Sequence, residues 1–380
     1  MKIKNYYKVL LITLLAIIST NCNTNRVNHK LTQQEIRDLY PSPNAPIENI
    51  SPAPSFSLAP QTPTPKKYPT YTPTPHPLSI EAMRKYPYEN SELVFEETLD
   101  QGYNYQRYIV SYHSDGLKIY AYLTIPNEKK PPASFPIIIF NHGYIPPAEY
   151  RSTERYVAYV DAFARRGYIV FRSDYRGHGN SEGTAVSAYL SPAYTIDVLN
   201  GLNAVKRLPQ ADPNRIGMWG HSMGGYITLR SMVITKDIKA GVIWAGVVAP
   251  YPDLFSQWRT IPTQHALPTL ARRWIGEDLW RRFGLPADEP QYWAMISANT
   301  YLKDLSGPVQ LHHGTQDGTV PIAFSEQLYK QIKAEGGIVE FYPYAGDNHN
   351  LSENFSLAMY RSIAFFNKYV KNAVLTEAAP

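Results

Sequence analysis

The sequence has little cysteine and little net charge, and each scarcity excludes a class of protein. Cys22 is the one cysteine among 380 residues, so neither a disulfide framework within the monomer nor a metal site built on several cysteines is possible. Lys and Arg exceed Asp and Glu by only 37 − 32 = 5. That excess is too small for a dedicated nucleic-acid binder, which carries a clustered basic stripe. The 44% share of hydrophobic residues excludes wholesale disorder.

The N-terminus is typical of an export signal. Lysines precede an apolar run at residues 9–18, and small or polar residues follow it up to Cys22. The run is too short to span a bilayer comfortably. The position of Cys22 resembles a bacterial lipoprotein signal, in which the cysteine becomes the lipidated first residue, although Asn21 and Ser19 depart from that pattern. Ordinary cleavage and an uncleaved anchor are the alternatives. We expect signal residues 1–22, a cell-envelope or secreted location, and membrane association through the N-terminus.

A proline-rich segment follows the signal. Residues 41–77 contain twelve prolines interleaved with Ser, Thr and Ala. Proline lacks the backbone N–H and has a fixed φ, so this segment cannot form a helix or a sheet ladder. We expect residues 23–90 to be an extended linker of polyproline-II type that separates a folded domain from its attachment point.

Hydrophobic patterning divides the folded part, residues 91–374, into two regions. The first strands alternate apolar and polar residues, as antiparallel strands with one buried face do. Later strands are solidly apolar and alternate with helices, which predicts a mostly parallel, doubly wound α/β sheet with antiparallel N-terminal strands. The expected strands are 92–99, 104–113, 117–125, 136–140, 168–172, 215–219, 238–245, 309–313 and 338–342; the expected helices are 153–166, 192–208, 223–234, 322–335 and 352–369.

The motif Gly-His-Ser-Met-Gly at 220–224 follows an expected strand and begins an expected helix. In this context a G-x-S-x-G pattern exposes a serine hydroxyl on a sharp turn at the carboxyl end of a sheet. Gly220 and Gly224 are needed there because side chains would collide with neighbouring backbone. We therefore expect Ser222 to be a nucleophile. The alternative is an ordinary glycine-rich turn between a strand and a helix.

Two later loops supply the other groups of an acyl-transfer site. A serine nucleophile needs a general base, and the base needs a carboxylate that orients it. His349 follows the last expected strand, and Asp317 follows the strand before it. The order Ser222, Asp317, His349 is the order of α/β-hydrolases. Asp304 is the competing carboxylate, but it precedes its strand and would lie at the opposite edge of the sheet.

The reaction also needs donors for a developing oxyanion. We expect one to be the backbone N–H of Met223, directly after the nucleophile. The second should come from the loop after the strand at 136–140, where the backbone N–H of Tyr144 is the candidate. His312 and His313 are adjacent and would face opposite sides of a strand, so they cannot jointly bind a metal. His221 should point away from the serine, and no metal or organic cofactor is expected.

From residue 135 to 369 the chain resembles the α/β-hydrolase superfamily. The stretch 311–349 is similar to the catalytic domain of the prolyl oligopeptidase (S9) family, in which His-Gly-x-x-Asp-x-x-Val-Pro, here 313–321, leads to the catalytic histidine. The loop at 174–181 is similar to one shared by that family and by lipase-type ester hydrolases. The resemblance implies an α/β-hydrolase fold with Ser222 as nucleophile, Asp317 as orienting carboxylate and His349 as base.

Two departures from the S9 pattern leave the substrate open. The best-known S9 peptidases carry a β-propeller that admits only short peptides, and fewer than a hundred residues separate the linker from the parallel strands. Members also often place a tyrosine hydroxyl just ahead of the glycines of the oxyanion loop, where this chain has Asn141 and His142.

The pattern breaks at about 251–300, which predicts a helical cap. This segment holds four of the six tryptophans, and we expect Trp258 and Trp274 to contact substrate in an apolar pocket. The alternative is that they only attach the insertion to the domain.

These observations predict a secreted or membrane-tethered serine hydrolase that acts through an acyl-enzyme. A small peptide is the expected substrate, in keeping with the S9 resemblance, and a carboxylic ester is the alternative. A third possibility is a non-catalytic binding protein of the envelope, although such a protein needs no nucleophile, acid or base.

Overall fold

The computed structural model describes residues 76–132, 134–258 and 284–372. The expected signal with Cys22, nearly all of the proline-rich segment, and Trp274 lie outside the described residues. The first described helix, α2 (Ile80–Arg84), lies ahead of residue 91, where the folded domain was expected to begin. None of the helices in the described ranges is long and apolar enough to cross a membrane.

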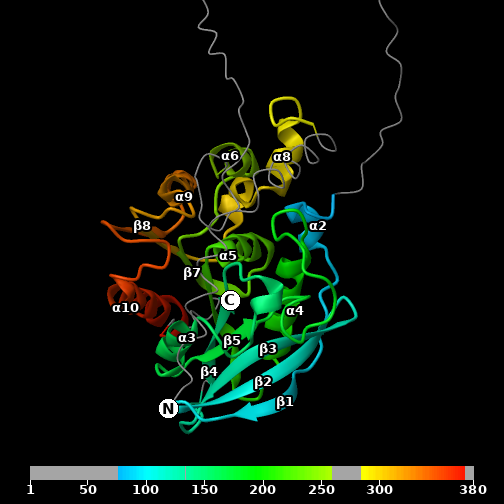
Figure 1. Cartoon of the computed structure of the whole chain (residues 1–380), viewed down its shortest axis with the longest axis vertical. Helices are drawn as coiled ribbons and strands as arrows, with labels where there is room; N and C mark the ends of the chain where they lie inside the picture. The colour runs from blue at the N-terminus through cyan, green and yellow to red at the C-terminus, as the bar shows by residue number, and fades with distance from the viewer. Residues whose placement is uncertain (1–75, 133, 259–283, 373–380) are drawn as a thin grey trace, which may run out of the picture. The chain divides into compact units, whose positions relative to one another are not determined.

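In the described ranges, nine strands form one sheet in the order β1-β2-β3-β5-β4-β6-β7-β8-β9 (Figure 1). The pairs β1/β2, β2/β3 and β3/β5 are antiparallel, and the other pairs are parallel. The strands are β1 (Val94–Leu99), β2 (Tyr105–Ser114), β3 (Leu117–Pro126), β4 (Phe135–Asn141), β5 (Ile169–Ser173), β6 (Ala211–His221), β7 (Ile238–Trp244), β8 (Val309–Gly314) and β9 (Val339–Tyr344). This confirms the mostly parallel sheet with antiparallel N-terminal strands, an α/β-hydrolase fold.

The helices that follow α2 in the described ranges are α3 (Val157–Ala164), α4 (Ala193–Val205), α5 (Met223–Ile234), α6 (Tyr251–Gln257), α8 (Pro290–Ile296), α9 (Ile322–Ala334) and α10 (Phe355–Phe366). Helices cover both faces of the sheet, so a central strand contributes to two cores. Ile137 and Ile139 of β4 belong to a core shared with α4, α5 and α9. Ile138 and Phe140 belong to the opposite core, shared with α3 and α10. Alternate side chains of a strand point to opposite faces, which explains why residues 135–140 of β4 are all apolar.

Helix α3 is shorter than the helix expected at 153–166. Its first residue is Val157, because Arg155 and Tyr156 have left-handed φ angles of 50° and 52° that end a right-handed helix. The apolar periodicity of this segment did not reveal the break.

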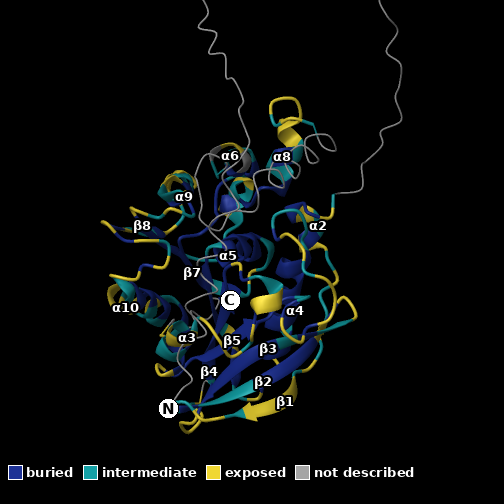
Figure 2. Ribbon diagram, viewed as in Figure 1, coloured by how far each residue is buried: buried dark blue, intermediate teal, exposed yellow. Residues whose placement is uncertain are grey.

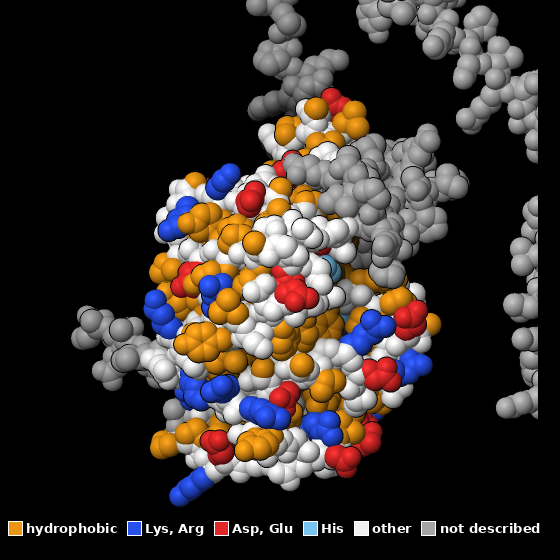
Figure 3. Space-filling view, turned by 60° about the vertical axis from the view of Figure 1, so that its left-hand side comes forward, with side chains coloured by type: hydrophobic (Ala, Val, Ile, Leu, Met, Phe, Trp, Pro, Cys, Tyr) orange, Lys and Arg blue, Asp and Glu red, His pale blue; other side chains and the backbone are white. Residues whose placement is uncertain are grey.

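Burial falls off toward one edge of the sheet. Figure 2 shows the central strands buried and β1 exposed, and the Val94 and Phe95 side chains of β1 are 54% and 48% exposed. On the face drawn in Figure 3, basic and acidic side chains are interspersed rather than gathered by sign.

Candidate active site

Ser222 lies on the sharp turn between β6 and α5. Its φ of 56° and ψ of −118° fall outside the regions that residues with side chains ordinarily adopt, so the backbone is strained. The turn is held in place because the Ser222 N–H donates to the Trp244 carbonyl at 3.0 Å and the Val247 N–H donates to the Ser222 carbonyl at 3.1 Å. Because α5 begins at Met223, the serine lies at the positive end of a helix dipole.

The glycines on either side of the serine allow backbone segments to approach closely. A Cβ atom on Gly220 would lie 2.2 Å from the Gly224 carbonyl oxygen. A Cβ atom on Gly224 would lie 2.0 Å from the Asn141 carbonyl oxygen. Both contacts would be clashes with backbone, as the sequence predicted, and the second brings the loop after β4 against the serine turn.

Asp317 lies in the loop after β8, and its carboxylate is buried. Its side chain is 0% exposed, and Oδ1 accepts hydrogen bonds from the N–H groups of Thr319 at 2.8 Å and Val320 at 2.9 Å. Oδ2 lies 2.8 Å from His349 Nδ1 and 3.0 Å from His313 Nε2. Burial by itself raises the pKa of Asp317, but the contacts with His313 and His349 outweigh it and hold the pKa well below its usual range.

His349 lies in the loop after β9 and is oriented by Asp317. The hydrogen bond at Nδ1 leaves Nε2 as the basic nitrogen of the neutral ring. The side chain is 17% exposed, and its ring centroid lies 4.6 Å from that of His221, the neighbour of Ser222. The structure thus brings the loops of Asp317 and His349 to the end of the sheet at which Ser222 lies.

The two expected oxyanion donors belong to the first residue of α5 and to the loop after β4. Met223 is the first residue of α5, and the first amides of a helix have no acceptor within it. A Cβ atom on Gly143 would lie 3.2 Å from Ser222 Cβ, so the loop that contains Tyr144 lies beside the nucleophile. The Gly143 N–H donates to the Tyr156 hydroxyl at 3.0 Å. The Tyr144 side chain is 64% exposed.

Tyr156 belongs to the site and was missed by the sequence analysis. Its hydroxyl lies 2.8 Å from His221 Nδ1, and His221 Nε2 lies 3.0 Å from the His349 carbonyl oxygen. His221 was expected to point away from the serine, and the structure shows that both of its ring nitrogens are hydrogen-bonded. No motif marks Tyr156, because its place depends on the left-handed residues ahead of α3.

Trp258 connects the cap segment to the loop of Asp317. Its indole N–H donates to the Thr319 carbonyl at 2.7 Å, and its ring packs edge-on against Tyr189 at 5.5 Å. Tyr189 in turn packs against Tyr226 of α5 at 5.0 Å. The aromatic rings therefore extend from the cap segment to the helix that begins at the serine turn.

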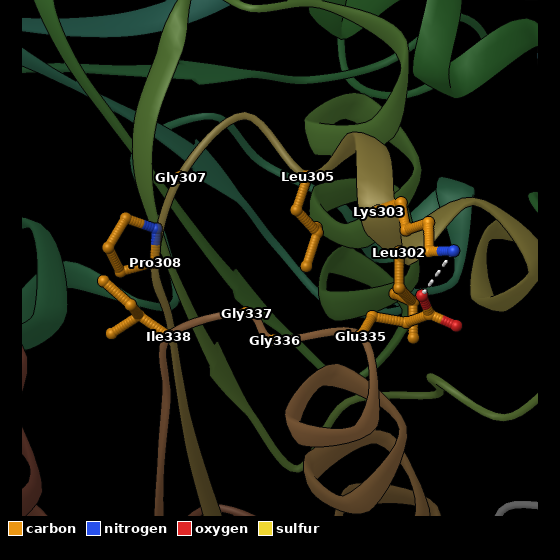
Figure 4. Close-up of a pocket in the computed structure, with 9 residues that line it drawn as sticks. All are labelled: Leu302, Lys303, Leu305, Gly307, Pro308, Glu335, Gly336, Gly337 and Ile338. Carbon is orange, nitrogen blue, oxygen red and sulfur yellow. Dashed lines mark ion pairs between the residues drawn. The ribbon is translucent and has the colours of Figure 1, made fainter.

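The amino ends of β8 and β9 carry a depression that is separate from these groups. Figure 4 shows it lined by residues that include Pro308 and Ile338, directly ahead of β8 and β9, and crossed by an ion pair from Lys303 to Glu335 at 3.6 Å. Asp317 and His349 follow the opposite, carboxyl ends of these strands. The described residues contain no group of three or more His, Cys, Asp or Glu side chains placed to hold a metal.

The competing carboxylate, Asp304, lies outside the site. It pairs with Arg84 at 2.8 Å, and its side chain is 46% exposed. Because it precedes β8, it lies toward the amino end of that strand.

The chain is similar in sequence to proteins named as a peptidase and as a lipase, and similar in fold to a solved peptidase structure. It is 26% identical over 243 residues to the uncharacterized peptidase YuxL of Bacillus subtilis, covering 63% of this chain and 34% of YuxL. It is 24% identical over 264 residues to the lysophosphatidylserine lipase ABHD12 of Danio rerio, covering 65% of each chain. Its fold matches Pyrococcus horikoshii acylaminoacyl peptidase with a TM-score of 0.56 at 23% identity, covering 72% of this chain and 43% of that one.

The chain also matches a protein-family model. The model of the prolyl oligopeptidase family matches residues 155–373, which is more than half of the 380-residue chain and includes all three candidate residues Ser222, Asp317 and His349. The chain belongs to the prolyl oligopeptidase (S9) family.

Proposed function

We propose that the chain is a serine hydrolase in which Ser222, His349 and Asp317 act as nucleophile, base and orienting carboxylate. The observation that carries this proposal is the 2.8 Å contact between His349 Nδ1 and buried Asp317, on loops that meet the strained serine turn. A nucleophile beside a base, with the base oriented by a third group, is the arrangement needed to activate a serine hydroxyl.

The reaction proceeds in two halves. His349 Nε2 takes the Ser222 hydroxyl proton as the oxygen attacks the substrate carbonyl carbon, and the Met223 and Tyr144 N–H groups donate to the oxyanion. The imidazolium then returns the proton to the leaving amine or alcohol, and an ester between Ser222 and the acyl group remains. Water, deprotonated by His349, attacks this ester and releases the acid and the free serine.

We place the substrate among small peptides. Membership in the S9 family and the relative named as a peptidase support cleavage of an amide bond. The alternative is a carboxylic ester, which the relative named as a lysophosphatidylserine lipase supports. The same nucleophile, base and oxyanion donors serve either bond.

The test is turnover by the full chain and by Ser222→Ala on two substrates, a proline-containing peptide anilide and a short-chain nitrophenyl ester. Turnover should fall by roughly 10⁴-fold or more in the variant. Serine enzymes often cleave activated esters, so the anilide decides the substrate class. Ser222-dependent cleavage of the anilide supports a peptidase, and cleavage of the ester alone identifies an esterase. A Ser222→Ala chain as active as the wild type would reject the proposal and favour a binding protein.

The proposed location is the cell envelope, with the N-terminus attached to a membrane through a lipid on Cys22. The cationic start, the short apolar run and the proline-rich linker support it. The full chain should fractionate with membranes, and Cys22→Ser should release it from them. An unchanged membrane fraction for Cys22→Ser would reject lipidation.

A further inference from the structure

A chain of hydrogen bonds crosses the site beside the nucleophile. The Gly143 N–H lies 3.0 Å from the Tyr156 hydroxyl oxygen, and that oxygen lies 2.8 Å from His221 Nδ1. His221 Nε2 then lies 3.0 Å from the backbone carbonyl oxygen of His349. The chain therefore joins the loop after β4, the end of β6 and the loop after β9, which hold the oxyanion donor, the nucleophile and the base.

The backbone groups at the two ends of this series of hydrogen bonds determine which atom donates in each bond. A backbone N–H can only donate and a carbonyl can only accept, so His221 Nε2 must carry the proton directed at His349. Burial lowers the pKa of His221 to about 3, so its ring is neutral and Nδ1 is an acceptor. Tyr156 consequently donates to His221 Nδ1 and accepts from Gly143. Each group in the chain is satisfied in this one arrangement.

The position of the Tyr156 hydroxyl is set by packing and by a buried arginine. The ring packs against Phe140 at 5.6 Å and against Trp219 at 6.3 Å. Arg172, 2% exposed at the end of β5, donates to the Arg155 carbonyl at 2.9 Å and also bonds to the carbonyl of Ser152. These contacts hold the left-handed turn at residues 155 and 156, which directs Tyr156 back toward the serine.

The surroundings of Gly143 show how close the hydrogen-bonded groups lie to Ser222. A Cβ atom built on Gly143 would lie 2.8 Å from the Tyr156 hydroxyl, 3.2 Å from Ser222 Cβ and 3.3 Å from His221 Nδ1. The Gly143 N–H is committed to Tyr156, which leaves the next N–H of the loop, that of Tyr144, for an oxyanion.

We propose that Tyr156 and His221 are positioning residues that set the distance of the base His349 and of the oxyanion loop from Ser222. Asp317 orients the imidazole of His349, and His221 holds the backbone of the same residue. The Tyr156 hydroxyl bonds both to His221 and to the Gly143 N–H of the oxyanion loop. One hydroxyl therefore positions the loop of the base and the oxyanion loop relative to each other. This inference rests on the proposed serine-hydrolase function.

The main test is Tyr156→Phe in the full chain, which removes one hydroxyl and keeps the ring. It should lower kcat by about 10- to 100-fold, the effect of a displacement of about 1 Å in a reacting group, and leave KM within about twofold. The midpoint of the pH–rate profile should not move, because the contact between Asp317 and His349 is intact. Tyr168→Phe is the matched control: its hydroxyl donates to Asn367 Oδ1 at 2.9 Å, away from the site, and turnover should be unchanged.

Two substitutions of His221 test its two hydrogen bonds separately, the one with Tyr156 and the one with the His349 carbonyl. Gln can place a donor where Nε2 contacts the His349 carbonyl but offers no acceptor at the place of Nδ1, whereas Asn can do the reverse. Because Tyr156→Phe and His221→Gln break the same link, the double variant should lose no more kcat than the worse single variant. His221→Asn should lose kcat even with Tyr156 present, since the base loop is then released.

Several outcomes would overturn the inference. Tyr156→Phe with kcat within twofold of the wild type would do so, as would a loss confined to KM or multiplicative losses in the double variant. A kcat loss that parallels a fall in the unfolding temperature would assign Tyr156 to stability alone. Ser222→Ala keeps the two proposals distinct: if that variant is inactive while Tyr156→Phe is fully active, only the positioning role fails.

Discussion

His349 Nδ1 lies 2.8 Å from Asp317 Oδ2, and the carboxylate that accepts this hydrogen bond cannot turn away from it. The reason is that its other oxygen is held by two backbone N–H groups, from Thr319 and Val320. A fixed carboxylate fixes the tautomer of the histidine and stabilises the positive charge that the ring acquires when it takes a proton.

Asp317→Asn should abolish most of the activity while the fold persists. The amide removes the negative charge that stabilises an imidazolium and can present a donor where an acceptor is needed, so kcat should fall by roughly 10⁴-fold. Asp304→Asn is the matched control, because the Asp304 carboxylate pairs with Arg84 at 2.8 Å and its side chain is 46% exposed. Steady-state turnover of the nitrophenyl ester measures both. Equal activities in the two variants would remove Asp317 from the site.

Gly143→Ala should impair turnover through crowding. The added Cβ would lie 2.8 Å from the Tyr156 hydroxyl and 3.2 Å from Ser222 Cβ, so the loop after β4 must move away from the serine. We expect kcat to fall about 100-fold or more with a normal circular dichroism spectrum. Gly318→Ala is the control, since a Cβ there meets nothing within 4 Å. Wild-type kcat in Gly143→Ala would contradict the close approach.

Trp258→Ala should change substrate preference more than it changes reactivity. The ring packs against Tyr189 and the indole N–H bonds to the Thr319 carbonyl, so we expect it to form part of an apolar acyl pocket. For an aromatic acyl ester, kcat/KM should fall roughly tenfold, the effect of losing a few apolar contacts. An acetyl ester, measured on the same preparation, should be almost unaffected. Equal losses on both esters would indicate that Trp258 only supports the loop of Asp317.

The folded chain should lose stability as the pH falls from about 6.5 toward 3. Burial lowers the pKa values of His221 and His312 to about 3. Above pH ~6.5 both histidines are neutral in either state, whereas below it only the unfolded chain takes up their protons. Each therefore contributes a slope of roughly 1.4 kcal/mol per pH unit in that window. Asp317, whose pKa is depressed, adds to the loss below about pH 4.

Urea unfolding at pH 7, 6, 5 and 4 measures this slope. His312→Gln removes one of the buried histidines whose pKa is lowered, so the free energy of unfolding of this variant should decline less steeply with falling pH than that of the wild type. An identical slope in the variant would mean that His312 does not stay neutral in the folded chain.

Arg230→Met should destabilise the fold without touching the reacting groups. The buried guanidinium donates to the carbonyls of Ile296 and Leu78, both at 2.6 Å, and so connects α5 to α8 and to the segment ahead of α2. Leaving two buried carbonyls without donors costs about 1–3 kcal/mol each, so unfolding should become easier by roughly 3 kcal/mol. Chemical denaturation measures this difference, and kcat at 25 °C should stay near the wild-type value. A change of less than about 0.5 kcal/mol would show that water replaces the arginine.

Much of the fold could be predicted because the spacing of apolar residues along a segment is a local property of the sequence. The solid apolar run at 136–140 corresponds to β4, whose residues enter the cores on both faces. The helix expected at 153–166 was wrong in its first residues. Arg155 and Tyr156 form a left-handed turn there, and Arg172 of β5 stabilises this turn by a hydrogen bond to the Arg155 carbonyl. Local pattern carries no signal for a contact made by a distant side chain.

The sequence by itself determined the order of strands and helices, the glycines around Ser222, and the choice of Asp317 and His349. Each of these depends on the residue type and on its position relative to the end of an expected strand, and the sequence shows both. Only the tertiary structure decided that the Tyr156 hydroxyl contacts His221 and that His221 contacts the backbone carbonyl of His349. Those contacts join residues 65 and 128 positions apart, and they depend on ångström-scale distances between loops that packing of the sheet and helices establishes.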